Sequence, residues 1–183
     1  MTAAQTEAPK VMFSAEQIHQ RVRELARQIS NDYRGRTLYA VAVLADGFIF
    51  MADLVRELDI DVICLFLRGE LQEIAQAAGK ATEIFFSPEV NVQGADVLLL
   101  EGIVETGVTS EFLMRNLIAR GAKSVKLAAL LDRSTARRIA LPLDYVGFTV
   151  DQRHFYGYGL GTPQLNRNLP YVAVAAGAAG VAP

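Results

Sequence analysis

Residues 97–109 read Val-Leu-Leu-Leu-Glu-Gly-Ile-Val-Glu-Thr-Gly-Val-Thr, and this stretch decides the predicted fold. Its apolar run, 97–100, is typical of a strand that is buried on both faces. A polar turn over 101–109 then leads into an amphipathic helix, for which Gly121 is a stop signal. This order predicts a phosphate site, because backbone N–H groups and a helix N-terminus converge at the turn. An ordinary turn with Thr109 or Ser110 as the helix cap is the alternative.

Strands and helices alternate along the rest of the chain. Ser14 and Gln17 form a capping box for a first helix, and a second helix is predicted from Phe48 to Leu58. Continuously apolar strands between helices indicate a parallel sheet covered on both faces, with ligands at the carboxyl ends of its strands. The other predicted strands are 38–44, 62–67, 83–86, 125–131 and 145–150.

Length and composition indicate one domain over residues 1–183, with flexible tails at 1–12 and 176–183. The net charge of −2 argues against a protein coated in basic residues, so no nucleic-acid partner is expected. No apolar run reaches the roughly 18 residues of a membrane span, and the polar start lacks the apolar core of a secretory signal. The single cysteine, Cys64, excludes an internal disulfide; we expect it to be buried, in a reducing cytoplasm.

The 97–109 stretch resembles the phosphoribosyl-pyrophosphate motif of type I phosphoribosyltransferases, and among them the hypoxanthine–guanine enzymes. That motif is an apolar run, two adjacent acids, two apolar residues, an acid, and then Thr-Gly-x-Thr. The resemblance implies an α/β fold with a central, mostly parallel sheet, helices on both faces and a small hood. It also implies a Mg²⁺-assisted reaction that joins a purine base to the ribose of phosphoribosyl pyrophosphate and releases pyrophosphate, and assembly as a homodimer or homotetramer. Further matches occur in order at 50–56, 120–125, 144–148, 157–160 and 167–171.

The resemblance implies that the site for the 5′-phosphate and the ribose is kept. Glu105 matches an acid beside the purine N7 that transfers a proton, and is the catalytic candidate. The base site comprises Arg133, in place of a lysine that donates to the 6-oxo group, together with Tyr145, which stacks on the purine, and the backbone of Val146. The phosphate and ribose residues are Glu101, Glu105, Thr106, Gly107, Val108 and Thr109.

The pyrophosphate, metal and lid positions depart from the family pattern. Gly102 replaces the second of the paired acids, and the pyrophosphate loop reads Ala45-Asp46-Gly47, with an acid where the family has a Lys-Gly pair. Arg167 matches the arginine near pyrophosphate. The metal-binding Asp falls on Gln152, so that Asp151 is the nearest carboxylate for a metal. The lid falls within 69–79, where 69–78 has the composition and apolar spacing of a helix instead.

These differences favour a protein that binds a purine nucleoside monophosphate or phosphoribosyl pyrophosphate, with weak or lost transferase activity. The kept positions serve a nucleoside monophosphate, whereas the altered ones serve pyrophosphate and metal. One alternative is an active purine phosphoribosyltransferase of purine salvage, with Mg²⁺. Another is an enzyme of altered nucleotide or phosphosugar chemistry.

Overall fold

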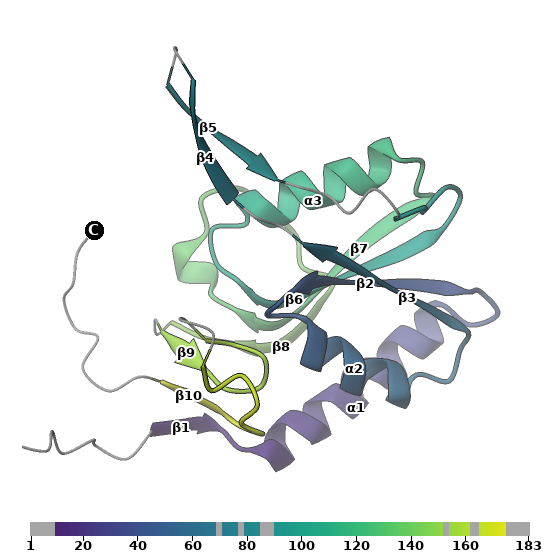
Figure 1. Ribbon diagram of the computed structural model, residues 1–183. Coiled ribbons are helices and arrows are strands. Elements are labelled where there is room, and N and C mark those ends of the chain that lie inside the picture. The colour runs from purple at the N-terminus through teal and green to yellow at the C-terminus, as the bar shows by residue number, and fades with distance from the viewer. Residues whose placement is uncertain are drawn as a thin grey trace, which may run out of the picture.

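The computed structural model describes residues 10–68, 71–76, 79–84, 90–151, 154–161 and 165–174. Five parallel strands form its central sheet, in the order β3-β2-β6-β7-β8 (Figure 1). The predicted parallel sheet is confirmed. The strands are β2 (Leu38–Leu44), β3 (Val62–Arg68), β6 (Asp96–Val104), β7 (Ser124–Asp132) and β8 (Tyr145–Thr149).

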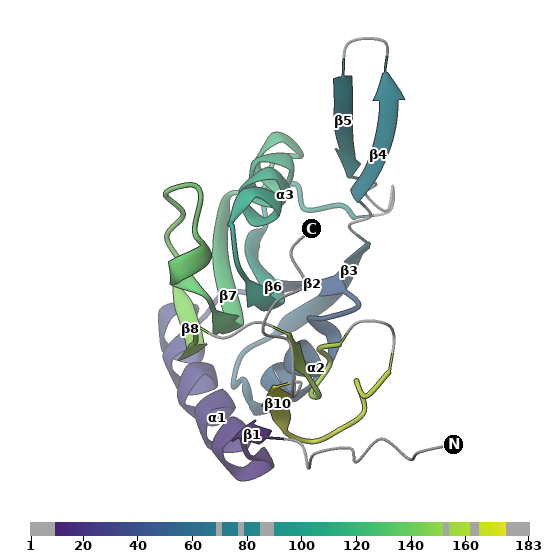
Figure 2. The ribbon, with the colours of Figure 1, turned by 90° about the vertical axis from the view of Figure 1, so that its left-hand side faces the viewer.

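Helices cover both faces of this sheet, as the sequence predicts (Figure 2). Helices α1 (Ala15–Asp32) and α2 (Phe48–Glu57) pack on one face, and α3 (Val108–Ala119) packs on the other. Successive side chains of a strand point to opposite faces, so Leu98 and Leu100 pack with α1 and α2, while Val97 and Leu99 pack with α3. The apolar run 97–100 therefore serves two cores at once. None of the helices in the described part of the chain is long and apolar enough to cross a membrane.

Helix α1 begins as the capping box predicts. The Ser14 hydroxyl accepts a hydrogen bond from the backbone N–H of Gln17 at 3.2 Å, and the Gln17 side chain accepts one from the backbone N–H of Ser14 at 2.9 Å. Two of the N–H groups that an open helix end leaves unpaired are satisfied in this way. The buried face of α1 carries Ile18, Val22, Leu25, Ala26 and Ile29.

A second, antiparallel sheet, β1-β10-β9, brings the two ends of the described chain together (Figure 1). It comprises β1 (Lys10–Phe13), β9 (Phe155–Tyr156) and β10 (Val172–Val174), and it corresponds to the expected hood. The tail predicted over residues 1–12 is therefore wrong for 10–12, because Lys10 and Val11 pair with Val174 and Ala173. The rest of that tail and the tail at 176–183 lie outside the described residues.

The helix predicted over 69–78 is wrong. Strands β4 (Leu71–Gln76) and β5 (Gly79–Ile84) form an antiparallel pair that projects beyond β3 and α3 (Figures 1 and 2). Gln76 pairs with Gly79, which leaves a two-residue connection of the kind that favours a hairpin. Helix propensity is a weak preference per residue, and the strand pairing overrides it. The strand predicted at 83–86 is the end of β5 and runs into residues outside the described ones.

Cys64 is exposed, so the prediction of a buried thiol is also wrong. Strand β3 forms one edge of the five-stranded sheet, and its side chains Ile63 and Phe66 are exposed as well. The apolar run 62–67 thus resembles a central strand in composition but lies at an edge. Composition reports the type of element, whereas position in the sheet depends on the pairing of distant segments.

Asp96 anchors the amino ends of β6 and β7. Its buried carboxylate accepts a hydrogen bond from the Ser124 hydroxyl at 2.6 Å and faces Arg36 at 3.1 Å and Lys123 at 3.3 Å. The Ser124 hydrogen bond, followed by the two cations, holds the pKa of Asp96 below its usual range.

We predict that Asp96→Asn lowers the free energy of unfolding by about 1.5–3 kcal/mol at pH 7, since hydrogen bonds to charged groups are worth about that much. A carboxyl whose pKa is depressed by folding stabilises the fold above its unfolded pKa, and this stabilisation is lost as the pH falls through the folded value. The difference between variant and wild type, measured by urea unfolding, should therefore shrink towards pH 3. Asp61→Asn, at an exposed site, is the control. A difference that persists unchanged at pH 3 would contradict this interpretation.

Candidate functional site

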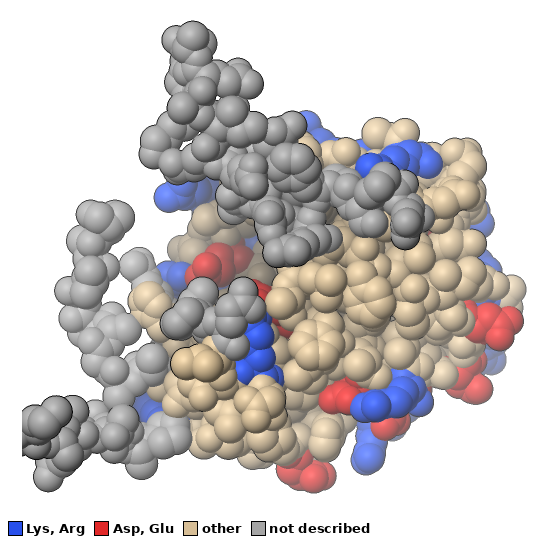
Figure 3. All heavy atoms as spheres, in the orientation of Figure 1, with Lys and Arg blue, Asp and Glu red and all other residues tan. Residues whose placement is uncertain are grey.

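The carboxyl ends of β2, β6 and β7 gather the predicted site residues at one edge of the sheet. These strands are parallel neighbours, so the segments that follow them, 45–47, 105–107 and 133–138, emerge side by side. Acidic and basic side chains gather in a recess of the face shown in Figure 3, on its left-hand side. The sequence prediction that chemistry lies beyond the carboxyl ends is consistent with this placement.

The loop 105–107 turns directly into the N-terminus of α3. Gly107 is the N-cap and adopts a left-handed conformation with φ of 81°, which favours glycine. The N-cap Gly107 has no side chain to cap this helix end, so capping by Thr109 or Ser110 is wrong, and the one described side-chain contact to a first-turn N–H is a long hydrogen bond from Val108 N–H to the Thr106 hydroxyl at 3.4 Å. The other first-turn N–H groups and the helix dipole can meet an anion here, and the half-buried residues Thr106 and Thr109 lie beside them in the sequence.

The segment after β7 fixes this loop in place. The backbone N–H of Arg133 donates to Val104 O and that of Arg138 donates to Thr106 O, both at 3.0 Å. The Arg137 guanidinium donates to Glu105 O at 3.0 Å and forms an ion pair with Asp132. Because three hydrogen bonds hold successive loop carbonyls, the loop is organised before any ligand arrives.

Glu101 lies inside β6, whereas the sequence predicts it in the turn that follows the strand. Strand β6 continues because Ile103 and Val104 still pair with Leu131 and Asp132 of β7. The Glu101 side chain is consequently buried, and no hydrogen-bond partner for its Oε1 is found in the described part of the chain. The pKa of Glu101 is raised to about 7, chiefly by burial and to a smaller extent by the nearby Asp46, against the opposing hydrogen bond with Ser110 and charge of Arg137. Near neutral pH this carboxyl can therefore accept or donate a hydrogen bond to a ligand hydroxyl.

Glu105, the catalytic candidate, forms an ion pair with Arg133, the base-site candidate. The Arg133 side chain is 12% exposed and that of Glu105 is 47% exposed. The structure thus brings together the two residues to which the resemblance assigns proton transfer and base binding. A base that binds here competes with Glu105 for the Arg133 guanidinium.

Asp46 and Arg167, which are 121 positions apart in the sequence, form an ion pair on the loop that packs against Gly102. The Arg167 guanidinium pairs with the Asp46 carboxylate and donates to the carbonyls of Gly159 and, at 2.7 Å, Gly161. The carbonyl of Asp46 lies so close to Gly102 that a Cβ there would approach it to 2.5 Å. The loop 45–47 therefore fills the space that a carboxylate side chain at 102 would need.

The predicted base contacts of Tyr145 and Val146 are wrong. Tyr145 is 2% exposed, and its hydroxyl donates to Asp32 at 2.6 Å and accepts from Lys126 at 3.2 Å. The carbonyl of Val146 accepts a hydrogen bond from Arg21 of α1 at 2.8 Å. Both residues are thus engaged in the core against α1, because they begin β8 instead of following it.

From the sequence we expect His154 to lie at the surface or an interface and to bind no metal, because no second His or Cys is available to complete a site. His154 follows β8 and is exposed, with a φ of 61° that is uncommon outside glycine.

The donor set does not fit a Mg²⁺ ion held by the protein alone. Mg²⁺ needs octahedral oxygen ligands, usually one or two carboxylates with substrate phosphates and water. Glu101 is buried and hydrogen-bonded with Ser110, and position 102 has no carboxylate. Among the described residues, no group of three or more His, Cys, Asp or Glu side chains could hold a metal ion. Asp151 is exposed after β8, and Gln152 lies outside the described residues. A metal at this site would therefore depend on oxygen ligands from a bound substrate.

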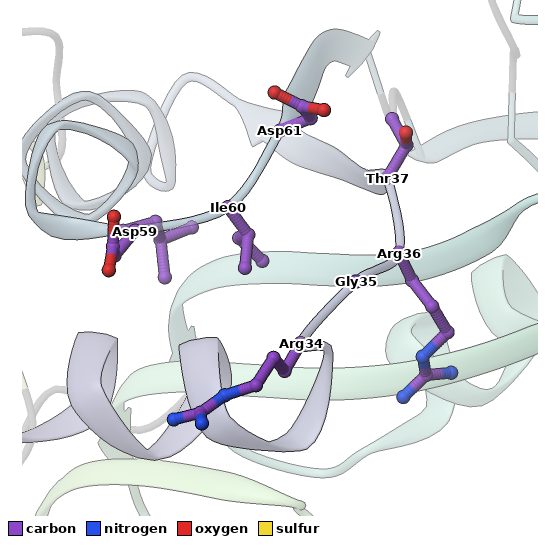
Figure 4. A pocket seen from close by; sticks show the side chains of 8 residues that line it. Arg34, Gly35, Arg36, Thr37, Asp59, Ile60 and Asp61 are labelled. Atoms are coloured by element: carbon purple, nitrogen blue, oxygen red, sulfur yellow. The ribbon is translucent and has the colours of Figure 1, made fainter.

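A hollow of about 510 Å³ lies at the other end of the sheet, before β2 and β3. Figure 4 shows Arg34, Arg36 and Thr37 on one side of it, and Asp59 and Asp61 on the other. Arg34 donates to Asn31 at 2.8 Å and Arg36 pairs with Asp96, so both cations already have partners. This hollow carries mixed charge and no predicted site residue.

Comparison with known proteins agrees with the family resemblance of the sequence and with the fold. The chain matches the phosphoribosyl transferase domain family over residues 14–161. It is 32% identical to the hypoxanthine-guanine phosphoribosyltransferase of Bacillus subtilis over 165 residues. This alignment covers 90% of this chain and 92% of that protein. It is 34% identical over 165 residues to the bifunctional protein TilS/HprT of Listeria innocua, covering 90% of this chain, but it spans only 26% of that relative's length.

Solved structures give the same result. A hypoxanthine-guanine phosphoribosyltransferase from Bacillus anthracis superposes with a TM-score of 0.79 at 32% identity, covering 92% of this chain and 98% of that chain. A mutant hypoxanthine phosphoribosyltransferase from Trypanosoma cruzi, in a ternary complex with substrates, gives 0.82 at 28% identity, covering 91% and 94%. The chain therefore belongs to the phosphoribosyl transferase family, as a member similar to the hypoxanthine–guanine phosphoribosyltransferases.

Proposed function

We propose that the chain binds a purine nucleoside monophosphate and transfers phosphoribosyl groups weakly or not at all. The observation that carries this proposal is the contrast between two parts of one site. The loop 105–109 turns at Gly107, opens a helix whose N-cap makes no side-chain hydrogen bond, and is held in place by backbone contacts, which suits a 5′-phosphate. The Arg167 guanidinium, by contrast, is already paired with an acid.

The arrangement suits each part of a nucleoside monophosphate. The phosphate would accept hydrogen bonds from the N–H groups at the start of α3 and from the hydroxyls of Thr106 and Thr109. A ribose hydroxyl would pair with the buried carboxyl of Glu101, whose Oε1 has no hydrogen-bond partner among the described residues. Arg133 would donate to an oxo group of the base once its contact with Glu105 loosens.

Group transfer makes further demands that this chain meets less well. Departure of pyrophosphate from the ribose leaves negative charge that needs fixed cations, and such electrostatic stabilisation commonly contributes more to catalysis than any other effect. Arg167 is committed to Asp46, and Gly102 supplies no carboxylate. Glu105, which would move a proton at the purine, is committed to Arg133.

An active purine phosphoribosyltransferase with Mg²⁺ is the second candidate function. The observation that favours it is the similarity to proteins named hypoxanthine-guanine phosphoribosyltransferase over about nine-tenths of both chains. In that case the ion pairs of the site open when substrates bind, and the substrate phosphates supply most of the metal ligands.

Two measurements on the purified chain separate these candidates. Guanosine or inosine monophosphate should bind in calorimetric titration, and absence of binding at millimolar ligand would overturn the proposal. Hypoxanthine or guanine mixed with phosphoribosyl pyrophosphate and Mg²⁺ should give little nucleotide. Turnover within tenfold of about 10 s⁻¹, a typical enzyme rate, would instead support the active transferase.

A further inference from the structure

We propose that Asp46 is a selectivity residue that restricts the site to ligands with a single phosphate ester. Its carboxylate acts as a built-in anion on Arg167, and so rejects a second phosphate group beside Glu101. This inference rests on the proposed binding of a nucleoside monophosphate, and it adds the reason why a ligand with a further diphosphate is excluded.

Arg167 has the surroundings of a preformed anion site. Its side chain is 19% exposed, and the carbonyls of Gly159 and Gly161 hold the guanidinium in place. Carbonyl oxygens orient a guanidinium without neutralising it, so its full charge still requires an anion. In this chain the anion is the Asp46 carboxylate.

Asp46 also lies where an incoming ligand would meet it. Its side chain is 47% exposed, more than twice the exposure of Arg167, so the acid faces solvent while the cation lies behind it. Its charge acts on the buried Glu101 carboxyl, which places Asp46 at the same recess as the proposed ribose contact. A second phosphate beside Glu101 would therefore approach a carboxylate first.

The loop that carries Asp46 cannot easily move aside. A Cβ added to Gly102 would lie 2.5 Å from the Asp46 carbonyl, and one added to Gly159 would lie 2.8 Å from it. Two segments of the chain thus approach this carbonyl at glycine positions, and Gly47 makes a similar close approach to the Leu100 carbonyl. Because the backbone is fixed in this way, replacement of the side chain should change the charge without relocating the loop.

The test compares two ligands on the variant Asp46→Asn. We expect its affinity for phosphoribosyl pyrophosphate, measured by calorimetric titration at constant ionic strength, to rise at least tenfold, since one repulsive charge is removed and one cation is released. Its affinity for guanosine monophosphate should stay within threefold of wild type. Inorganic pyrophosphate should gain affinity in parallel. Asp46→Ala serves as a second variant should the first fail to fold.

Two controls identify the cause of the gain. Asp59→Asn makes the same charge change at an exposed position at the other end of the sheet, and should alter neither affinity. Adding Arg167→Gln to Asp46→Asn should remove the part of the gain that the released guanidinium supplies, so the double variant should bind phosphoribosyl pyrophosphate more weakly than Asp46→Asn.

The outcomes for the two proposals are distinct. An unchanged affinity of Asp46→Asn for phosphoribosyl pyrophosphate, or an equal gain for both ligands, would overturn the selectivity role even where wild type binds guanosine monophosphate. Failure of wild type to bind guanosine monophosphate would overturn the proposed function. The selectivity role would then stand or fall on the gain for phosphoribosyl pyrophosphate alone.

Discussion

Replacement of Gly107 by alanine is expected to weaken the binding of guanosine monophosphate roughly 30-fold, which corresponds to about 2 kcal/mol. The backbone at this position has a φ of 81°, where a side chain costs about 1–2 kcal/mol. The added Cβ would also lie 3.2 Å from side-chain atoms of Arg137 and Ile139. Relief of this crowding moves the loop carbonyls and the first N–H groups of α3 away from the positions that suit a phosphate.

A matched glycine separates this local effect from a general loss of stability. Gly35 has a similar φ of 74°, and a Cβ added there meets nothing within 4 Å. Gly35→Ala should therefore destabilise the protein by about 1 kcal/mol in urea unfolding while the affinity for guanosine monophosphate stays unchanged. Equal affinities for Gly107→Ala and Gly35→Ala would place the phosphate elsewhere on the protein.

The central sheet could be predicted from the sequence because its information is local. Apolar runs such as 38–44 and 97–100 must be buried on both sides, and the capping box at Ser14 and Gln17 needs only four consecutive residues. The pair β4–β5 escaped prediction for the converse reason. Its residues have a composition that suits a helix, and only the pairing of 71–76 with 79–84 makes them strands.

The geometry of the candidate site could be predicted from local sequence only where one segment builds it. The loop 105–109 is such a segment, and its place at the start of α3 follows from its own glycine and the strand before it. The ion pair of Asp46 with Arg167 joins residues 121 positions apart. No local sequence pattern could therefore indicate that the Asp46 carboxylate pairs with the Arg167 guanidinium. The predicted base contact of Tyr145 is wrong for the same reason, since its hydroxyl donates a hydrogen bond to Asp32, 113 positions away.

Replacement of Glu101 by glutamine should stabilise the fold at alkaline pH. Burial raises the pKa of this carboxyl from 4.5 in an unfolded chain to about 7 in the folded protein. Below pH 4.5 the carboxyl is protonated in both states. Between pH 4.5 and 7 the unfolded chain releases a proton that the folded chain keeps, so the stability of wild type falls as the pH rises, by about 3 kcal/mol in total.

Glu101→Gln removes this pH dependence because an amide is neutral throughout and can still accept a hydrogen bond from Ser110. Urea unfolding should find the variant more stable than wild type by about 2–3 kcal/mol at pH 8, and by much less at pH 4.5. Glu105→Gln, the same change at a half-exposed carboxylate four residues away, should shift stability by less than about 1 kcal/mol at either pH. If Glu101→Gln is no more stable than wild type at pH 8, then burial does not destabilise the ionised form of this carboxyl. If the variant gains stability but binds guanosine monophosphate more weakly, then the chain tolerates a destabilising buried acid because a ligand hydroxyl needs it.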